Sequence, residues 1–172
     1  GDATFSPIDS SAAGTAGSTS LTATNAGFTG GQIVLIHQTR GTGVGQYERR
    51  TISSYTSGTI TLTEPLTYTY TTSGNSAAQV LVLTQYTDGS IASTKTLAAK
   101  AWDGTVGGII SFICNGTLTI SGTISASGYG YRLGSASSGG QANAGEGTTG
   151  PAVAQQANNG SGGGGGSNDV GS

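Results

Sequence analysis

The chain has 172 residues, of which only 8 % are charged, and its formal net charge is −2. About a quarter of the residues of a soluble domain are usually charged, so electrostatic repulsion between copies of this chain is weak. Six Lys and Arg against eight Asp and Glu leave no basic face for nucleic acid. The apolar run of about 18 residues that a membrane helix needs is absent, so we expect no membrane insertion.

The chain contains no methionine, even at its first position, as expected of a processed chain or of an excerpt from a longer one. No signal peptide is visible. A secreted protein from which the signal has been removed fits this pattern, and a fragment of a longer chain fits it too. We therefore expect a secreted protein, extracellular or on the cell surface.

Residues 1–20 form a stretch rich in Ser, Ala, Thr and Gly, with one short apolar cluster around Phe5, Pro7 and Ile8. The stretch is either a flexible leader or an extended N-terminal arm. As an arm it packs on another subunit and adds a strand to that subunit's sheet. On this hypothesis residues 1–12 are needed for polymerisation and are dispensable for the fold of the monomer.

Residues 21–127 carry the signals of an all-β domain. Continuous apolar runs at 32–37 and 79–83 indicate strands covered on both faces. Alternation at 59–63 and 66–70 indicates half-buried strands. Turn residues separate these segments, and no stretch of twelve residues shows a helical period. We predict a β-sandwich or a β-helix-like domain.

The last 45 residues, 128–172, are one third glycine and contain only three large aliphatic residues. Such a segment cannot bury a core of its own, and its composition alone favours disorder. Gly recurs every six residues from Gly116 to Gly140, which suits a strand or an extended helix with three residues per turn. We predict that the β domain continues into glycine-rich extended strands of polyglycine II type, which become ordered only with neighbouring strands.

No catalytic constellation is visible in the sequence. His37 is the sole histidine, and a satisfied histidine at the end of a strand is the favoured interpretation. Cys114 is the sole cysteine, and we expect a buried, inert thiol. Two His and Cys residues in all cannot hold zinc. The sequence therefore predicts no enzyme activity, no cofactor and no metal site.

The carboxylates have structural interpretations too. Glycoside hydrolysis needs two of them at a set separation, and Glu48, Glu64, Asp88 and Asp103 are the candidates. We expect Glu48 to pair with the arginines beside it, and the other three to lie in turns. The Asp spacing matches no calcium motif, and the glycines of 41–45 lack the lysine of a phosphate-binding loop.

Tyrosines offer one route to a ligand, because tyrosines on a β surface can stack on sugars. Three of them lie in Thr-rich strands, at Tyr55, Tyr68 and Tyr70, and Tyr129 and Tyr131 lie with Arg132 next to the tail. Ordinary strand packing is the favoured alternative. The N-glycosylation pattern occurs at residues 115–117 and 159–161, a short signal that matters only in a host with that pathway.

Two blocks carry a resemblance: GGQIVLIHQTRGTGVGQYERRTISS at 30–54 and AKAWDGTVGGIISFICNGTLTISGTISASGYGYR at 99–132. Their order before a Gly/Asn/Ser tail resembles a loosely described set of secreted bacterial surface proteins, over roughly residues 30–165. The tail also resembles the polyglycine-helix region of phage tail-fibre adhesins, although YRLGSA stands at 131–136, where a denser glycine run usually begins. The resemblance implies an extracellular fibre, surface-layer or adhesive role, with no assigned activity.

Two functions from different classes remain. The first is a non-enzymatic structural subunit that assembles with copies of itself into an extracellular filament, fibre or sheath. The second is a carbohydrate- or cell-binding adhesin module, with surface glycans as its partners. Low charge, Thr- and Ser-rich strands and the glycine-rich tail favour the first.

Overall fold

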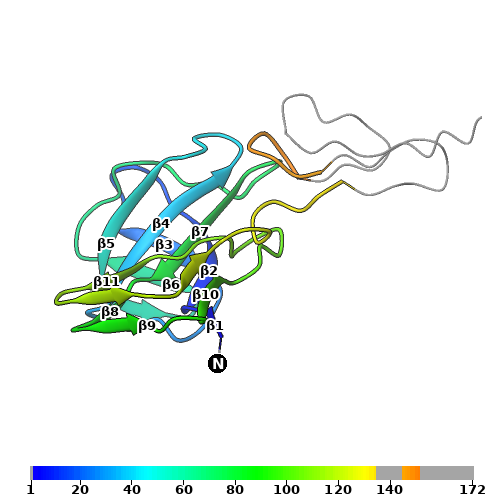
Figure 1. Cartoon of the computed structure of the whole chain (residues 1–172). Helices are drawn as coiled ribbons and strands as arrows, with labels where there is room; N and C mark the ends of the chain where they lie inside the picture. Colours follow the sequence, from blue (N-terminus) through cyan, green and yellow to red (C-terminus); the bar gives the residue numbers. More distant parts are fainter. Residues whose placement is uncertain (1, 135–144, 152–172) are drawn as a thin grey trace, which may run out of the picture.

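The computed structural model of the chain describes residues 2–134 and 145–151, and there it contains thirteen strands and no helix. Figure 1 shows an antiparallel barrel with shorter strands packed beside it. The prediction of an all-β fold is confirmed. None of the residues described forms a helix long and apolar enough to cross a membrane.

The largest unit is a closed six-stranded antiparallel barrel. Around the barrel the strands follow the order β2 (Asp9–Ala13), β3 (Ser20–Ala23), β6 (Thr59–Leu62), β5 (Tyr47–Thr56), β4 (Ile33–Arg40) and β7 (Ala77–Val82). Closure gives each of these strands two neighbours and leaves no free edge. The barrel stands where the sequence suggested a β-sandwich or a β-helix-like domain.

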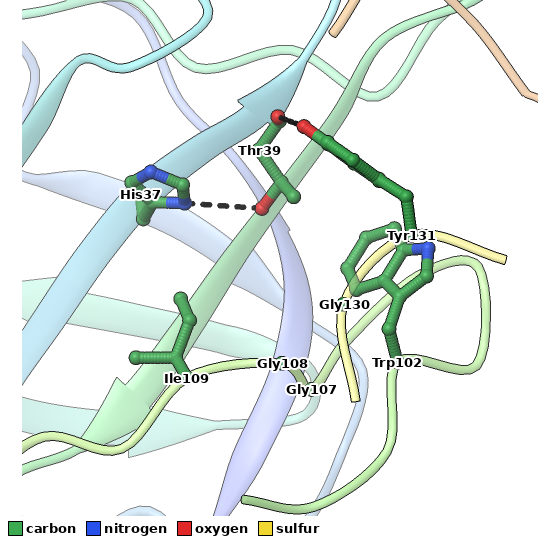
Figure 2. Close-up of a pocket in the computed structure, with 8 residues that line it drawn as sticks. All are labelled: His37, Thr39, Trp102, Gly107, Gly108, Ile109, Gly130 and Tyr131. Atoms are coloured by element: carbon green, nitrogen blue, oxygen red, sulfur yellow. Dashed lines mark hydrogen bonds between the residues drawn. The ribbon is translucent and has the colours of Figure 1, made fainter. Parts of the chain in front are cut away.

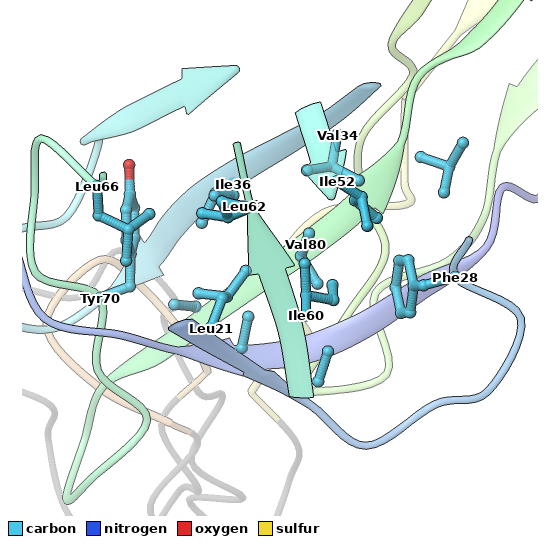
Figure 3. Packing of buried hydrophobic residues seen from close by; sticks show 14 residues of the cluster. Leu21, Phe28, Val34, Ile36, Ile52, Ile60, Leu62, Leu66, Tyr70 and Val80 are labelled. Atoms are coloured by element: carbon cyan, nitrogen blue, oxygen red, sulfur yellow. The ribbon is translucent and has the colours of Figure 1, made fainter. Parts of the chain in front are cut away.

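The barrel interior is the main hydrophobic core. On β4 the even-numbered positions from Val34 to Arg40 are buried and the odd-numbered ones half-buried, because successive side chains of a strand point to opposite faces. Figure 3 shows Val34 and Ile36 among Leu21, Ile60 and other members of this cluster. The expectation that 32–37 is fully covered on both faces is therefore wrong, and the half-buried strand expected at 59–63 is confirmed as β6.

The strand predicted at 66–70 is absent, although its alternation is real. Leu66 and Tyr70 are buried in the barrel core, and Tyr68 between them is exposed. The backbone N–H groups of Thr67 and Tyr68 donate to the Glu48 carboxylate instead of to a neighbouring strand. A side chain here takes the hydrogen bonds that a sheet partner would otherwise make.

Strand β7 is buried at every position, as its continuous apolar run predicted. One face of the strand points into the barrel, where Ala78, Val80 and Val82 join the core. Gln79, on the other face, bonds through its side-chain amide to the backbone N–H and C=O of Gly107. A second layer therefore covers the outside of the barrel at β7.

This second layer, residues 84–125, consists of two successive turns of chain that pair in parallel. The first turn holds β8 (Thr84–Tyr86), β9 (Gly89–Ile91) and β10 (Thr96–Ala99), and the second holds β11 (Phe112–Cys114), β12 (Leu118–Ile120) and β13 (Thr123–Ser125). They pair β8 with β11, β9 with β12 and β10 with β13. We refer to residues 84–125 as the parallel layer.

The segment expected to be an N-terminal arm contributes to the chain's own sheets. β1 (Ala3–Phe5) pairs in parallel with β10, and β2 pairs with β3 and β7 of the barrel. Lys100 Nζ lies 2.8 Å from Asp9 Oδ2, an ion pair between β2 and the residue after β10. Deleting residues 1–12 would therefore remove most of a barrel strand, so the arm hypothesis is not carried further.

Two glycines of the six-residue period lie at corners of the parallel layer. A Cβ atom on Gly116 would stand 2.5 Å from the carbonyl oxygen of Thr87, and one on Gly122 would stand 2.3 Å from the carbonyl oxygens of Ala92 and Lys95. Real Cβ atoms do not approach oxygen so closely. Here the glycine spacing therefore serves close contact between backbones at two corners.

We predict that Gly122→Ala destabilises the fold by about 2 kcal/mol, because the added methyl group overlaps two backbone carbonyls that cannot move independently. Chemical denaturation of the purified chain measures this. Gly130→Ala is the matched control, since a Cβ there meets no atom within 4 Å and should change stability by less than about 0.5 kcal/mol. Equal effects of the two changes would contradict the assignment.

Candidate functional site

The Glu146 carboxylate is the best-connected charged group among the residues that the structure describes. Its side chain has 0 % exposed surface. Oε1 lies 2.8 Å from Nη1 of Arg40 and 2.8 Å from Nη2 of Arg132. Oε2 accepts from the indole Nε1 of Trp102 at 2.7 Å and from the backbone N–H of Arg132 at 3.0 Å. Both oxygens are therefore saturated with donors, as a buried charge requires.

Three distant parts of the chain meet at this carboxylate. Arg40 ends β4 of the barrel, Trp102 follows β10 of the parallel layer, and Arg132 lies beyond β13. Glu146 itself belongs to residues 145–151, which Figure 1 shows beside the loop after β4. The N–H of Gly41 donates to the carbonyl of Thr148 at 2.7 Å. The cluster of Arg40, Trp102, Arg132 and Glu146, which we call the anchor cluster, therefore fastens residues 145–151 to both layers.

The electrostatics of the anchor cluster favour the charged carboxylate. Burial alone would raise the pKa of Glu146, but hydrogen bonds from Arg132 and Trp102 outweigh that and lower the pKa to about 2. The hydrogen bond to Glu146 raises the pKa of Arg132 in turn. The group is thus a fixed ion-pair partner at neutral pH and has no basicity for proton transfer.

Next to the anchor cluster lies a small apolar pocket of about 160 Å³. Its lining residues, drawn in Figure 2, are His37, Thr39, Trp102, Gly107, Gly108, Ile109, Gly130 and Tyr131. The Trp102 and Tyr131 rings meet edge to face with centroids 6.2 Å apart. The Tyr131 hydroxyl donates to the carbonyl of Thr39, which joins the segment after β13 to the barrel. Three glycines leave the pocket wall as bare backbone.

His37 is hydrogen-bonded, as expected, but it lies inside β4 and not at the end of a strand. Its Nδ1 is 3.1 Å from the Thr39 hydroxyl, shown in Figure 2, and burial lowers the pKa of the imidazole. Within residues 2–134 and 145–151, no hydrogen bond joins the His37 ring to a serine, a cysteine or an acid. The neutral ring therefore serves as a wall of the pocket.

The carboxylates singled out in the sequence occupy separate structural positions. Glu48 Oε2 pairs with Arg50 Nη2 at 2.5 Å, which confirms the expected ion pair. Asp103 Oδ1 accepts from the N–H groups of Thr105 and Val106 and caps the predicted turn. Asp88 Oδ1 accepts from the N–H of Thr117 and thus joins the two turns of the parallel layer. Glu64 is exposed after β6.

Cys114 differs from the expectation of a buried thiol. It ends β11, is half-buried, and its Sγ lies 3.7 Å from the carbonyl of Thr87. Among the residues that the structure places, no three His, Cys, Asp or Glu side chains gather as a metal site would require. Asn115 of the first glycosylation pattern is exposed, and the pattern at 159–161 lies outside the described residues.

Glu146 was not among the candidate residues that the sequence suggested. The available signal was charge: in a chain with 8 % charged residues, only two acids, Glu146 and Asp169, stand within the glycine-rich stretch 128–172. Its partners Arg40 and Trp102 lie 106 and 44 residues away along the chain, so spacing alone could not connect them.

Comparison with known proteins yields no assignment: no family model, no curated protein and no solved structure matches this chain.

We predict that Glu146→Gln lowers the free energy of unfolding at pH 7 by about 3 kcal/mol, because it leaves Arg40 and Arg132 without their buried counter-charge. Because the folded-state pKa is lowered, Glu146 stabilises the fold above pH 4.5, and this contribution is lost as pH falls from about 4.5 to about 2. Urea denaturation across pH 2–7 should therefore show a flatter acid limb for the variant. Glu64→Gln, at an exposed carboxylate, is the control; a variant as stable as the native chain would contradict the role of Glu146.

We predict that a stability component is lost as pH falls below about 6.5, since burial lowers the pKa of His37 and the folded state disfavours the protonated ring. His37 is the sole histidine of the chain, so its replacement should remove that component. Unfolding of the native chain and of His37→Gln at pH 7.5 and pH 5.5 measures it. An identical pH dependence of the two proteins would refute the assignment.

Proposed function

We propose that this chain is a non-enzymatic structural subunit of an extracellular self-assembling filament, fibre or sheath. The observation that carries the proposal is the anchor cluster. A fully buried, four-fold bonded carboxylate fixes residues 145–151 to the barrel and to the parallel layer. Glu146 lies within the glycine-rich segment 128–172, so this attachment suits a subunit that transmits force between its folded part and the rest of that segment.

The charged groups of the folded part support a structural role. Glu146 bonds to two arginines, Asp9 to Lys100, and Glu48 to Arg50. Each of these carboxylates is buried and holds two segments of chain together. Buried carboxylates that are paired in this way serve to hold the fold together.

The parallel layer and the glycine-rich sequence after it also suit a fibre. The parallel layer is, on this proposal, two turns of a β-helix, because three successive strands pair in register with three strands one turn earlier. The glycine-rich sequence beyond it would supply extended strands of polyglycine II type that associate between subunits. Low net charge leaves little repulsion to oppose that association.

A carbohydrate- or cell-binding adhesin is the second candidate, and the apolar pocket favours it. Trp102 and Tyr131 present aromatic surface beside the bare backbone of Gly107, Gly108 and Gly130. A volume of about 160 Å³ accepts no more than a single small ring. An aromatic ring face can stack on the apolar face of a sugar ring.

The test is negative-stain electron microscopy with light scattering on the purified full chain over a concentration series. We expect uniform fibres above a threshold concentration. Glu146→Ala should form fewer and shorter fibres, since the link between the folded part and the glycine-rich stretch is released. Glu64→Ala is the matched control and should form fibres as the native chain does.

Near-ultraviolet circular dichroism of each variant verifies that the barrel is folded before fibres are counted. Monodisperse native protein at every concentration would overturn the structural proposal. In that case binding to a glycan array, lost on filling the pocket with Gly130→Leu, would establish the adhesin.

A further inference from the structure

The second turn of the parallel layer ends in open strand edges. β11 pairs with β8, β12 with β9 and β13 with β10, and none of the three has a second partner among the residues described. Three consecutive strands therefore present unpaired N–H and C=O groups on the same side of the layer. Unpaired edges of this kind are templates for another strand.

Apolar side chains are exposed at the same place. Ile120 is 50 % exposed, Ile124 38 % and Leu118 36 %. In the register of the layer they stand beside Ile91, Leu97 and Gly89 of the first turn. Ile91 and Leu97 are less exposed because the second turn covers them, whereas no described segment covers Leu118, Ile120 and Ile124. We call β12, β13 and these three side chains the open end.

The open end lacks the charges that usually keep edge strands apart. No Asp, Glu, Lys, Arg or His occurs between Gly108 and Tyr131, which includes all of β11, β12 and β13. Soluble proteins normally protect an exposed edge with lysine, proline or an inward charge. An unprotected and uncharged edge with apolar side chains indicates a surface that is covered in the working state.

The chain's own described segments do not cover it. After β13 the backbone turns at Gly128, and Tyr129 accepts a hydrogen bond from the N–H of Trp102, so the chain returns towards the barrel. The remaining sequence, 135–144 and 152–172, contains only Val153 and Val170 as large aliphatic residues. These residues therefore offer fewer large aliphatic side chains than the three of the open end.

We propose that the open end binds the open end of a second copy of this chain, with a two-fold axis between them. The opposite side of the layer is not available for head-to-tail stacking at this point, because β1 already pairs with the free edge of β10. Two identical open ends can instead meet face to face, with β12 and β13 running antiparallel to their counterparts. Leu118, Ile120 and Ile124 of both copies are then removed from water together.

This inference rests on the proposed assembly role and supplies one interface of it. A two-fold contact closes on itself and gives pairs, so a fibre needs a second contact, for which the glycine-rich stretch is the candidate. The open end and the stretch are separate surfaces, and they can be tested separately.

The test is sedimentation equilibrium of the native chain and of the double variant Ile120→Lys/Ile124→Lys. Below the concentration at which fibres form, we expect the native mass to rise towards twice the monomer mass. The double variant should associate at least tenfold more weakly, since it brings four buried ammonium groups together. Tyr47→Lys is the matched control: Tyr47 is 65 % exposed on the barrel and its replacement should leave association unchanged.

Hydrogen exchange gives a second readout, because backbone amides of residues 118–125 should become protected as native concentration rises. A native chain that stays monomeric, equal association of the double variant, or amides already protected in the monomer would each overturn the inference. Fibres that form equally well with the double variant would overturn it and leave the proposed function intact. Pairs without fibres would support it and overturn the proposed function.

Discussion

The buried carboxylate of Glu146 is the constraint on which the junction of this molecule depends. A charge in the interior is tolerated only when strong donors surround it, and two arginines, an indole and a backbone N–H do so here. The donors come from three distant places in the chain, Arg40, Trp102 and Arg132, so satisfying the charge fixes their mutual positions. The segment 145–151 has few apolar side chains, and these bonds do for it what a hydrophobic core does elsewhere.

The parallel layer depends on the barrel for its stability more than the barrel depends on the layer. The barrel closes on itself and buries a continuous cluster of aliphatic and aromatic side chains. The parallel layer consists of strands of three or four residues, too short to be stable alone. It is held to the barrel by the Asp9–Lys100 ion pair and by the bonds of Gln79 to Gly107, and the segment after β13 is held by the bond of Tyr131 to Thr39. Hydrogen bonds and an ion pair between the barrel and the parallel layer thus hold in place short strands that hydrophobic burial alone would not position.

The anchor cluster and the open end suggest two different roles in assembly. At the anchor cluster the buried Glu146 carboxylate is paired with two arginines, and these bonds connect residues 145–151 to the barrel and the parallel layer. At the open end, charge is absent and backbone edges are unpaired. The first arrangement resists pulling apart because breaking it exposes uncompensated charge. The second permits association because nothing in it repels a copy of itself.

Local sequence determined what depends on side-chain period and on turn residues. Strict alternation at 59–63 and a continuous apolar run at 79–83 correspond to a half-buried strand and a fully buried one, since those patterns follow directly from the pleat. The Glu48–Arg50 pair and the cap by Asp103 were also local, two or three residues apart. Alternation at 66–70 predicted the buried side chains and failed for the strand, because Glu48 takes the backbone donors there.

Only the tertiary structure decided the closure of the barrel, the parallel pairing and the anchor cluster. β2 closes the barrel with β7, about seventy residues later in the chain, and Arg40 meets Glu146 across 106 residues. Periodicity reports the face on which a side chain lies and carries no information about which distant strand or charge will meet it. The sequence thus determined an all-β chain of low charge with a glycine-rich end, and long-range packing decided which edges stay open and which charges are buried.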